Sequence, residues 1–120
     1  MDRERGAALV EFALVLSILV MILFGIIEFG RAYQVQLSVT HASREGVRVL
    51  AVTQDPAEAV AATMGAAGSL DLAALQVEPG ICTPGEATQL RVAYPVSYDI
   101  PLFGSATLTL TSTAVMQCGG

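Results

Sequence analysis

The chain has 120 residues, of which 53% are hydrophobic and only 14% are charged. This balance excludes an intrinsically disordered chain, and the length leaves no room for a second full domain. The formal net charge is −5 and all six basic residues are Arg, so no broad basic face exists for nucleic-acid phosphates. The hydrophobic residues are unevenly distributed, because they make up 19 of the 25 residues in 6–30. The composition therefore indicates one apolar segment joined to a small domain of ordinary composition.

The apolar segment, residues 7–27, is 21 residues long and has Glu11 as its single charged residue. A helix of this length covers about 30 Å, the thickness of a bilayer's hydrocarbon core. A cleaved signal peptide, cut near residues 30–32, is the first alternative, but its apolar core would be shorter. A buried helix of a soluble protein is the second, but so small a domain could hardly surround it. We therefore predict a transmembrane helix over residues 7–30.

The orientation of this helix is weakly specified by charge, because Arg residues lie on both sides of it. The two cysteines are more informative. Cys82 and Cys118 both follow the span, and a bond between them would need an oxidising compartment. This favours an N-terminus in the cytoplasm and a C-terminal domain, which we call the head, outside it.

Glu11 is the most informative residue of the segment. A carboxylate inside an apolar span costs a few kcal/mol on insertion scales, so it needs a partner or a function. One interpretation is structural: the side chain reaches from the membrane interface toward the lipid headgroups. The residues around it favour a second interpretation.

Gly6 is preceded by a charged leader, residues 2–5, and followed by the sequence Ala-Ala-Leu-Val-Glu-Phe, residues 7–12. This pattern resembles the processing site of type IV prepilins, in which a membrane peptidase cuts after the Gly and leaves Glu in fifth place. The resemblance implies cleavage between Gly6 and Ala7, with Glu11 and Phe12 used in processing and assembly. The new α-amine of Ala7 would be positively charged, and Glu11 of a neighbouring subunit would neutralise it. Such a pair would set the axial stagger of packed helices.

Two further segments, residues 25–31 (GIIEFGR) and 42–48 (ASREGVR), are similar to the N-terminal region of TadE-like proteins, pilin-like components of the tight-adherence (Flp) pilus. The resemblance covers about residues 5–50 and departs from the family at Ser17, where Pro is frequent. It implies three kinds of partner besides the membrane: a prepilin peptidase, other pilin-like subunits and the pilus assembly machinery.

Residues 31–54 contain no proline, so we expect the helix to continue beyond the membrane. An apolar stripe recurs there at three- and four-residue steps, and the charged residues lie largely off it. These charges form either a solvated face with local i,i+3 pairs or a contact between subunits, for which Ala42 and Gly46 would permit close helix approach. The candidate subunit contacts are Glu28, Arg31, Arg44, Glu45 and Arg48.

The head, residues 55–120, is predicted to hold a short helix and three strands. Asp55-Pro56 is typical of a helix start, and the Ala-rich helix should run to about Ala67. Alternation and turn residues, including Pro101 to Gly104, predict strands over 75–78, 88–98 and 106–117. Pro95 implies an edge position or a bulge. We expect an α+β fold: a long N-terminal transmembrane helix, a short second helix, and a three-stranded antiparallel meander with its apolar face on the helices and its Thr face outward.

Cys82 and Cys118 predict a disulfide that pins the last strand, with two free thiols as the alternative. Two cysteines and the distant His41 fall short of a zinc site. The sequence has no phosphate-binding loop, dinucleotide motif or nucleophile elbow, so we expect no catalytic residue, cofactor or small-molecule substrate.

These observations lead to one functional hypothesis and two alternatives. The hypothesis is a minor pilin-like subunit in the cytoplasmic membrane, processed after Gly6, assembled through its apolar helix into a tight-adherence pilus, and supporting surface adhesion. The first alternative is a single-pass membrane protein that never polymerises and whose head binds a partner or ligand. The second is a secreted soluble domain that starts near Tyr33.

Overall fold

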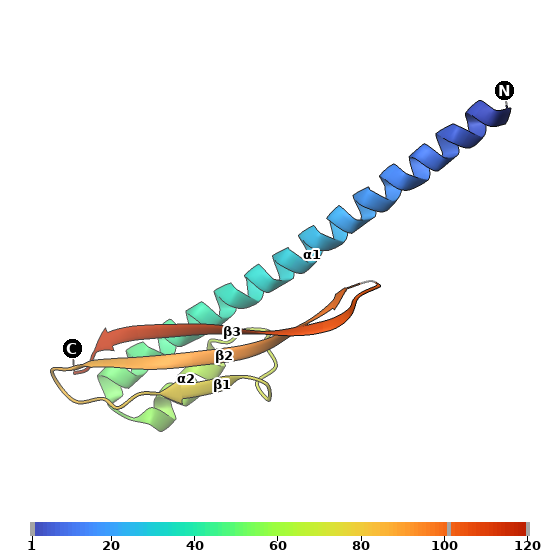
Figure 1. The fold of residues 1–120 in the computed structure, drawn as a ribbon. Coiled ribbons are helices and arrows are strands. Elements are labelled where there is room, and N and C mark those ends of the chain that lie inside the picture. Colours follow the sequence, from blue (N-terminus) through green and yellow to red (C-terminus); the bar gives the residue numbers. More distant parts are fainter. Residues whose placement is uncertain (1, 101, 120) are drawn as a thin grey trace. The chain divides into compact units, whose positions relative to one another are not determined.

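The computed structural model describes residues 2–100 and 102–119 (Figure 1). Two helices precede three strands, which confirms the predicted α+β class. In chain order the elements are α1 (Asp2–Thr53), α2 (Pro56–Gly65), β1 (Gln76–Pro79), β2 (Ala87–Ile100) and β3 (Gly104–Gln117). The chain divides into two compact units, residues 1–31 and residues 32–120, each described by itself below.

The first unit is helical from Asp2 onward, so the helix includes the described residues of the predicted leader. Within the described residues, α1 is the one helix long and apolar enough to cross a membrane. The helix is continuous at Ser17, whose hydroxyl donates to the carbonyl oxygen of Ala13 at 2.7 Å. This bond satisfies the one polar side chain of residues 12–24 within the helix itself.

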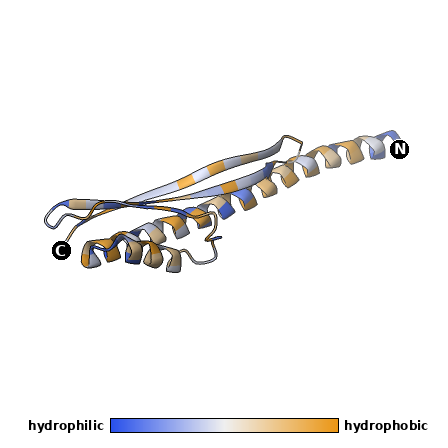
Figure 2. Cartoon of the chain, turned by 90° about the horizontal axis from the view of Figure 1, so that it is seen from below, coloured by the Kyte–Doolittle hydropathy of each residue, from blue (hydrophilic) through white to orange (hydrophobic). Residues whose placement is uncertain are grey.

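The second unit is an antiparallel sheet of strand order β1-β2-β3 with the two helices on one face, as Figure 2 shows. The three strands and their meander order confirm the prediction, with ends that differ by at most two residues. β2 pairs with β3 along its whole length, from Ala87 opposite Gln117 to Ile100 opposite Gly104. β1 is shorter and pairs with β2 from Leu90 to Ala93. Pro101 lies outside the described residues.

The position of Pro95 follows from this pairing. At Pro95, β2 pairs with Thr109 of β3, but β1 has already ended its pairing at Ala93. The missing N–H of proline therefore interrupts no ladder, although β2 is the central strand elsewhere. The predicted edge position is correct, and the register with β3 continues without a bulge.

The start of α2 confirms the predicted cap. The Asp55 carboxylate accepts a hydrogen bond from the backbone N–H of Ala57 at 2.9 Å, and Pro56 occupies the first helical position. The helix ends at Gly65, two residues earlier than predicted. Ala66 caps it, and Gly68 adopts a positive φ of 67° in the turn that follows.

The core lies between the helices and the inner face of the sheet. Residues of β2 alternate between the two faces, so Leu90, Val92 and Val96 are buried while Arg91 is exposed. The core is built from α1, α2, the connection to β1, and β2. Its buried members are Val39, Ala42, Val47, Leu50, Ala59, Ala67, Leu75, Leu90 and Val92.

The faces of β3 agree with the prediction only in part. Thr107, Thr109, Thr111 and Thr113 are exposed, as expected of an outward face. On the other face Leu110 and Ala114 are half-buried, but Leu108 remains 51% exposed. The helices therefore cover the middle of β3 and leave part of its apolar face open. Ser112 on that covered face contacts Ser43 of α1, with 3.0 Å between the hydroxyl oxygens.

Cys82 and Cys118 form a disulfide, as the sequence predicted. The C-terminal end of the described chain is held again at Gly119, whose N–H donates to the carbonyl oxygen of Ala51 at 2.8 Å. The two cysteines are separated by 36 residues. Closing a loop of this size stabilises the fold by about 4 kcal/mol in the chain-entropy account. This contribution is large for a head with so small a core.

Gly46 marks the closest approach of α1 to its neighbours. A Cβ at Gly46 would overlap the Thr63 hydroxyl of α2 and would lie 2.9 Å from a methyl group of Leu90 in β2. The close approach predicted at Ala42 and Gly46 therefore exists, but within the chain. Both residues are buried within the second unit and are not available as a surface for a second subunit.

Gly46→Ala tests this packing. Alanine is the better helix former by about 1 kcal/mol, yet its methyl group must displace Thr63 or Leu90, which costs about 1–3 kcal/mol. We expect a lower free energy of unfolding, measured by urea denaturation with circular dichroism. Gly65→Ala is the matched control, because no atom lies within 4 Å of the Cβ position there. Equal stability of the two variants would contradict the packing described for Gly46.

Candidate assembly surfaces

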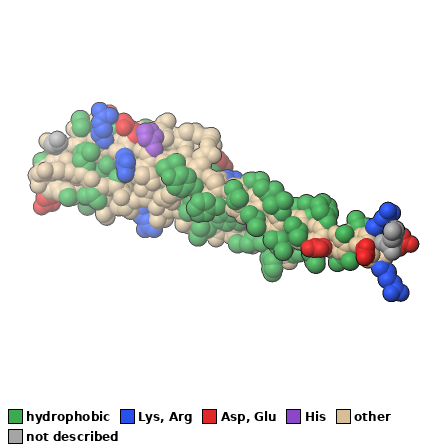
Figure 3. All heavy atoms as spheres, turned by 90° about the horizontal axis from the view of Figure 1, so that it is seen from above, with side chains coloured by type: hydrophobic (Ala, Val, Ile, Leu, Met, Phe, Trp, Pro, Cys, Tyr) green, Lys and Arg blue, Asp and Glu red, His purple; other side chains and the backbone are tan. Residues whose placement is uncertain are grey.

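The first candidate surface is the apolar segment of α1 in the first unit. Every described residue from Asp2 to Ile27 is exposed, and large side chains such as Leu9, Phe12 and Ile18 are at least 60% exposed. Figure 3 shows hydrophobic side chains distributed over this part of the helix. The backbone groups are satisfied inside the helix, so only the side chains need an apolar environment. Lipid or other apolar helices can supply it.

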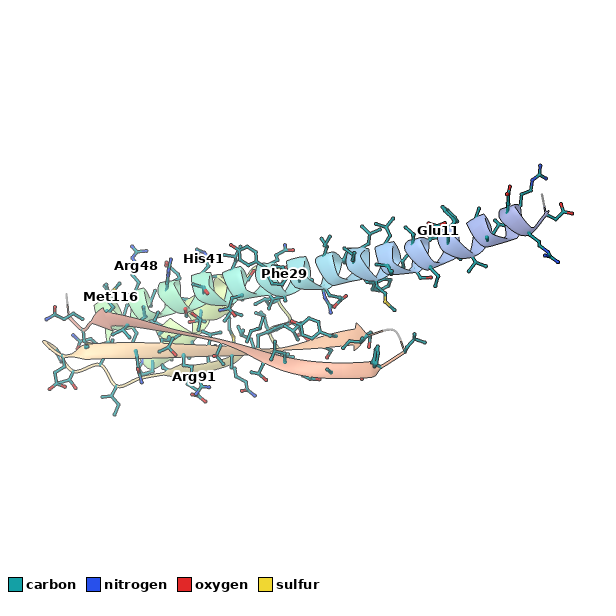
Figure 4. The ribbon with its side chains drawn as sticks, turned by 45° about the horizontal axis from the view of Figure 1, so that its top comes forward. Glu11, Phe29, His41, Arg48, Arg91 and Met116 are labelled. Carbon is teal, nitrogen blue, oxygen red and sulfur yellow. A yellow bond between two sulfur atoms is a disulfide. The ribbon has the colours of Figure 1, made fainter. Side chains whose placement is uncertain are left out.

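Glu11 lies in this surface and projects outward from the helix (Figure 4). Within residues 2–100 and 102–119 no salt bridge includes it. Ala7 precedes Glu11 by four residues, so both lie on one face of the helix, about 6 Å apart along the axis. The geometry leaves this carboxylate available to a positive group that comes from outside the described chain.

Gly6 is equally accessible. No atom lies within 4 Å of the position that a Cβ would take there. Gly6 and Ala7 are both exposed and helical, and acidic residues Asp2 and Glu4 occupy the first turn. A helix carrying a glycine at this point is about 1 kcal/mol less stable locally than one carrying alanine. The peptide bond between Gly6 and Ala7 therefore lies in an exposed helical turn that the glycine weakens.

Glu28 and Arg31 form a salt bridge of 2.9 Å at the end of the first unit. The sequence left open whether this pair is local or joins two subunits, and the structure forms it locally. Both side chains are partly exposed, at 29% for Glu28 and 51% for Arg31. An exposed pair of this kind contributes at most about 1 kcal/mol.

The second candidate surface lies on the outer side of α1 in the second unit. Glu45 and Arg48 form a salt bridge of 3.4 Å, and Arg44 and His41 are exposed beside them. Figure 4 shows His41 and Arg48 projecting from α1, and Met116 near the end of β3. Together these elements form a shallow hollow. It is lined by His41, Arg44, Glu45, Val47, Arg48, Ala114, Val115 and Met116.

The hairpin between β2 and β3 is a third surface, which sequence reasoning treated only as a turn. Its side chains Leu102 and Phe103 are 91% and 82% exposed. The signal that could have identified it is the pair of large apolar residues between Pro101 and Gly104, where turns usually carry polar residues.

Metal and catalytic chemistry find little support in these surfaces. Across residues 2–100 and 102–119, no group of three or more His, Cys, Asp and Glu side chains could hold a metal ion. His41 lies beside Arg44 and Arg48 on an exposed helix face.

Residues 6–48 match the family model described as TadE-like protein. The match confirms the resemblance predicted from the sequence, and it covers Gly6, Glu11 and every candidate contact on α1. Residues 49–120, which include α2 and the sheet, lie outside it. Neither a curated protein nor a solved structure matches the chain significantly.

Arg48→Ala tests whether the second surface stabilises the head. Because the Glu45–Arg48 pair is exposed, we expect the free energy of unfolding to change by less than about 0.5 kcal/mol. Leu50→Ala, two residues away and fully buried, should instead cost about 2–5 kcal/mol. Both can be measured by urea denaturation. A loss of stability in Arg48→Ala close to that of Leu50→Ala would show that the charged face belongs to the fold.

Proposed function

We propose that this chain, with its TadE-like residues 6–48, is a minor pilin-like subunit of a tight-adherence pilus. The observation that carries the proposal is an uncovered apolar helix with a single unpaired carboxylate, Glu11, four residues after Ala7. The family match supports association with the pilus. The minor role, the processing and a contribution to surface adhesion are our inference.

The proposed pathway begins with insertion of residues 7–30 into the cytoplasmic membrane, with the N-terminus inside and the head outside. The disulfide Cys82–Cys118 supports this orientation, because such bonds persist in oxidising compartments. A prepilin peptidase then cuts between Gly6 and Ala7. The residues removed contain two acidic and two basic side chains and the original α-amine, so cleavage leaves the net charge of the helix unchanged and moves the positive α-amine to Ala7, four residues before Glu11.

Assembly then transfers the apolar helix from lipid to a bundle of similar helices. Apolar side chains alone favour this transfer weakly, because lipid tails are as apolar as the helices. A charge pair between the α-amine of Ala7 and Glu11 of a neighbour would supply both attraction and register. In this arrangement Phe12 packs beside the charge pair. The Arg and Glu residues of α1 near the head are the candidate contacts between subunits.

The mature N-terminus tests the processing step. We expect mass spectrometry of the chain purified from its own membranes to find Ala7 as the first residue. Gly6→Leu should abolish this cleavage and leave residues 1–6 attached, whereas Gly30→Ala, a glycine substitution in the same helix, should not. A wild-type chain that retains Met1 would support the non-polymerising membrane anchor, and a start near Tyr33 would support a secreted domain.

Glu11→Ala tests the assembly step. We expect normal membrane insertion, because the variant helix is more apolar, but a loss of assembled pili. The unpaired α-amine would weaken each helix contact by about 3–5 kcal/mol. Membrane fractionation and electron microscopy of pili are the measurements.

Ser17→Ala is the matched control for that experiment, since it removes a polar side chain that bonds only to its own helix. Normal piliation in Glu11→Ala would overturn the proposed role of the carboxylate.

A further inference from the structure

Strand β3 forms one open edge of the sheet in the second unit (Figure 1). Its 14 residues, Gly104–Gln117, contain no charged residue and no proline, and their register with β2 has no bulge. Charged side chains, prolines and bulges are the devices by which natural proteins prevent another strand from pairing with such an edge. Because β3 is long and has none of the three, its edge can accept an added strand.

Two hydrogen bonds show which backbone groups of β3 face this edge. The N–H of Cys118 donates to the carbonyl oxygen of Glu86 at 2.8 Å, so the even-numbered residues bond toward β2. The odd-numbered residues therefore direct their N–H and C=O groups away from β2. In agreement, the carbonyl oxygen of Thr111 accepts a hydrogen bond from the side chain of Gln36 in α1 at 3.4 Å.

A hollow lies along the part of the edge whose backbone groups are unbonded. Within the described part of the chain, the outward N–H and C=O groups of Thr113 and Val115 form no hydrogen bond. The hollow beside them is lined on β3 by Ala114, Val115 and Met116. Consecutive side chains of a strand point to opposite faces of the sheet, so a hollow that contacts all three lies at the edge of the strand. Space for an added strand therefore exists beside the unbonded groups.

The outer side of α1 forms the other wall of this hollow and carries an excess of positive charge. Its residues there include His41, Arg44, Glu45 and Arg48, of which His41 and Arg48 are labelled in Figure 4. Glu45 pairs with Arg48, whereas no salt bridge among the described residues includes Arg44. Residues 55–120, by contrast, carry six acidic residues and one Arg. The wall is thus a local positive patch on an acidic domain, and such a patch favours an anionic partner.

We propose that this edge binds an extended segment of a partner protein that carries acidic side chains, and that the segment joins the sheet as a fourth strand beside β3. Backbone hydrogen bonds to Thr113 and Val115 supply affinity for an extended chain. Carboxylates at alternate positions of the segment face α1 and supply selectivity through Arg44 and Arg48. The inference gives a partner chemistry to a surface that the proposed function treats as a subunit contact, and in that sense rests on it.

A second copy of the chain fits this edge less well than an acidic strand does. If β3 paired with β3 of another copy about a two-fold axis, the same surface would occur on both sides of the contact. Arg44 and Arg48 of both copies would then lie along one seam, and the repulsion of like charges would disfavour it. A distinct protein with an acidic segment avoids this repulsion.

Fluorescence anisotropy tests the proposal with the full chain in dodecyl maltoside, an uncharged detergent. The probe is a fluorescein-labelled peptide of sequence Thr-Val-Glu-Val-Glu-Val-Thr, and the comparison peptide has Lys in place of both Glu. We expect the Glu peptide to bind about tenfold more tightly, because two charge attractions are replaced by two repulsions in the Lys peptide. Equal affinity for the two peptides would overturn the acidic partner.

Val115→Pro tests the backbone contact. Proline removes the outward N–H of this residue and leaves the ladder to β2 intact, so the Glu peptide should bind about tenfold more weakly. Val115→Ala is the matched control, since it also shortens the side chain but keeps the N–H, and it should bind like the unaltered chain. Circular dichroism verifies that both variants are folded. Equal affinities of the two variants would overturn strand addition.

Arg44→Glu tests the charge contact without changing β3, so it remains informative if the proline variant fails to fold. We expect the preference for the Glu peptide over the Lys peptide to fall by about tenfold or more. Arg91→Glu is the matched control, because it makes the same change in net charge at an exposed residue of β2 that does not line the hollow. An equal loss of preference in both variants would overturn a role for Arg44.

Two further measurements separate this inference from its alternatives. Size-exclusion chromatography detects the second copy: if the chain forms dimers that Val115→Pro dissociates, and does not bind the Glu peptide, the edge pairs with itself and the acidic partner is overturned. Glu11→Ala should bind the Glu peptide like the unaltered chain. A failure of the proposed assembly role therefore shows in the pili of that variant, and a failure of strand addition shows in the anisotropy.

Discussion

The uncovered apolar helix over residues 7–30 is the constraint on which the rest of the molecule depends. Each large apolar side chain left in water costs about 1.5–3 kcal/mol, and nothing within the first unit covers them. The helix must therefore lie in lipid or among other helices. Once it does, the hydrophobic effect no longer distinguishes these two environments. The choice between lipid and other helices therefore depends on the polar groups that the helix retains, and Glu11 is the one charged group within the apolar run.

A single helix serves two environments, and its composition changes where the environment changes. Up to Ile27 the side chains are exposed on all sides, whereas from Val39 onward one face is buried against the sheet and α2. Small residues permit that burial, because Gly46 lets the helix approach Thr63 and Leu90 closely. The disulfide and the bond from Gly119 to Ala51 then fix β3 to the same helix. The head, residues 55–120, is in this sense built around the C-terminal half of α1.

Local chemistry was sufficient to predict most of this fold. The cap at Asp55, the alternation in β2 and the cysteine pair each depend on neighbouring residues, and each prediction is confirmed. Features that depend on residues distant in the sequence were harder to predict. The burial of Gly46 requires knowledge that α2 folds back onto α1, and the exposure of Phe103 requires knowledge that β2 and β3 reach beyond α2 and β1. For Pro95 the sequence could not say where the edge would lie, because β2 is a central strand that becomes an edge only where the shorter β1 ends.

The proposed cleavage would change the electrostatic setting of Glu11 as well as create its partner. Before cleavage the helix begins at Asp2, and Glu11 lies in its third turn, where the helix dipole has little effect. A helix that begins at Ala7 places Glu11 just after the first turn, close to the unpaired N–H groups that favour an anion. The same dipole disfavours the positive α-amine of that chain, and an acid four residues after a cation is the weaker i,i+4 order. The amine therefore gains more from a carboxylate of a neighbouring helix, displaced along the axis, than from its own. Cleavage would in this way favour an ion pair between two staggered helices over an ion pair within one helix.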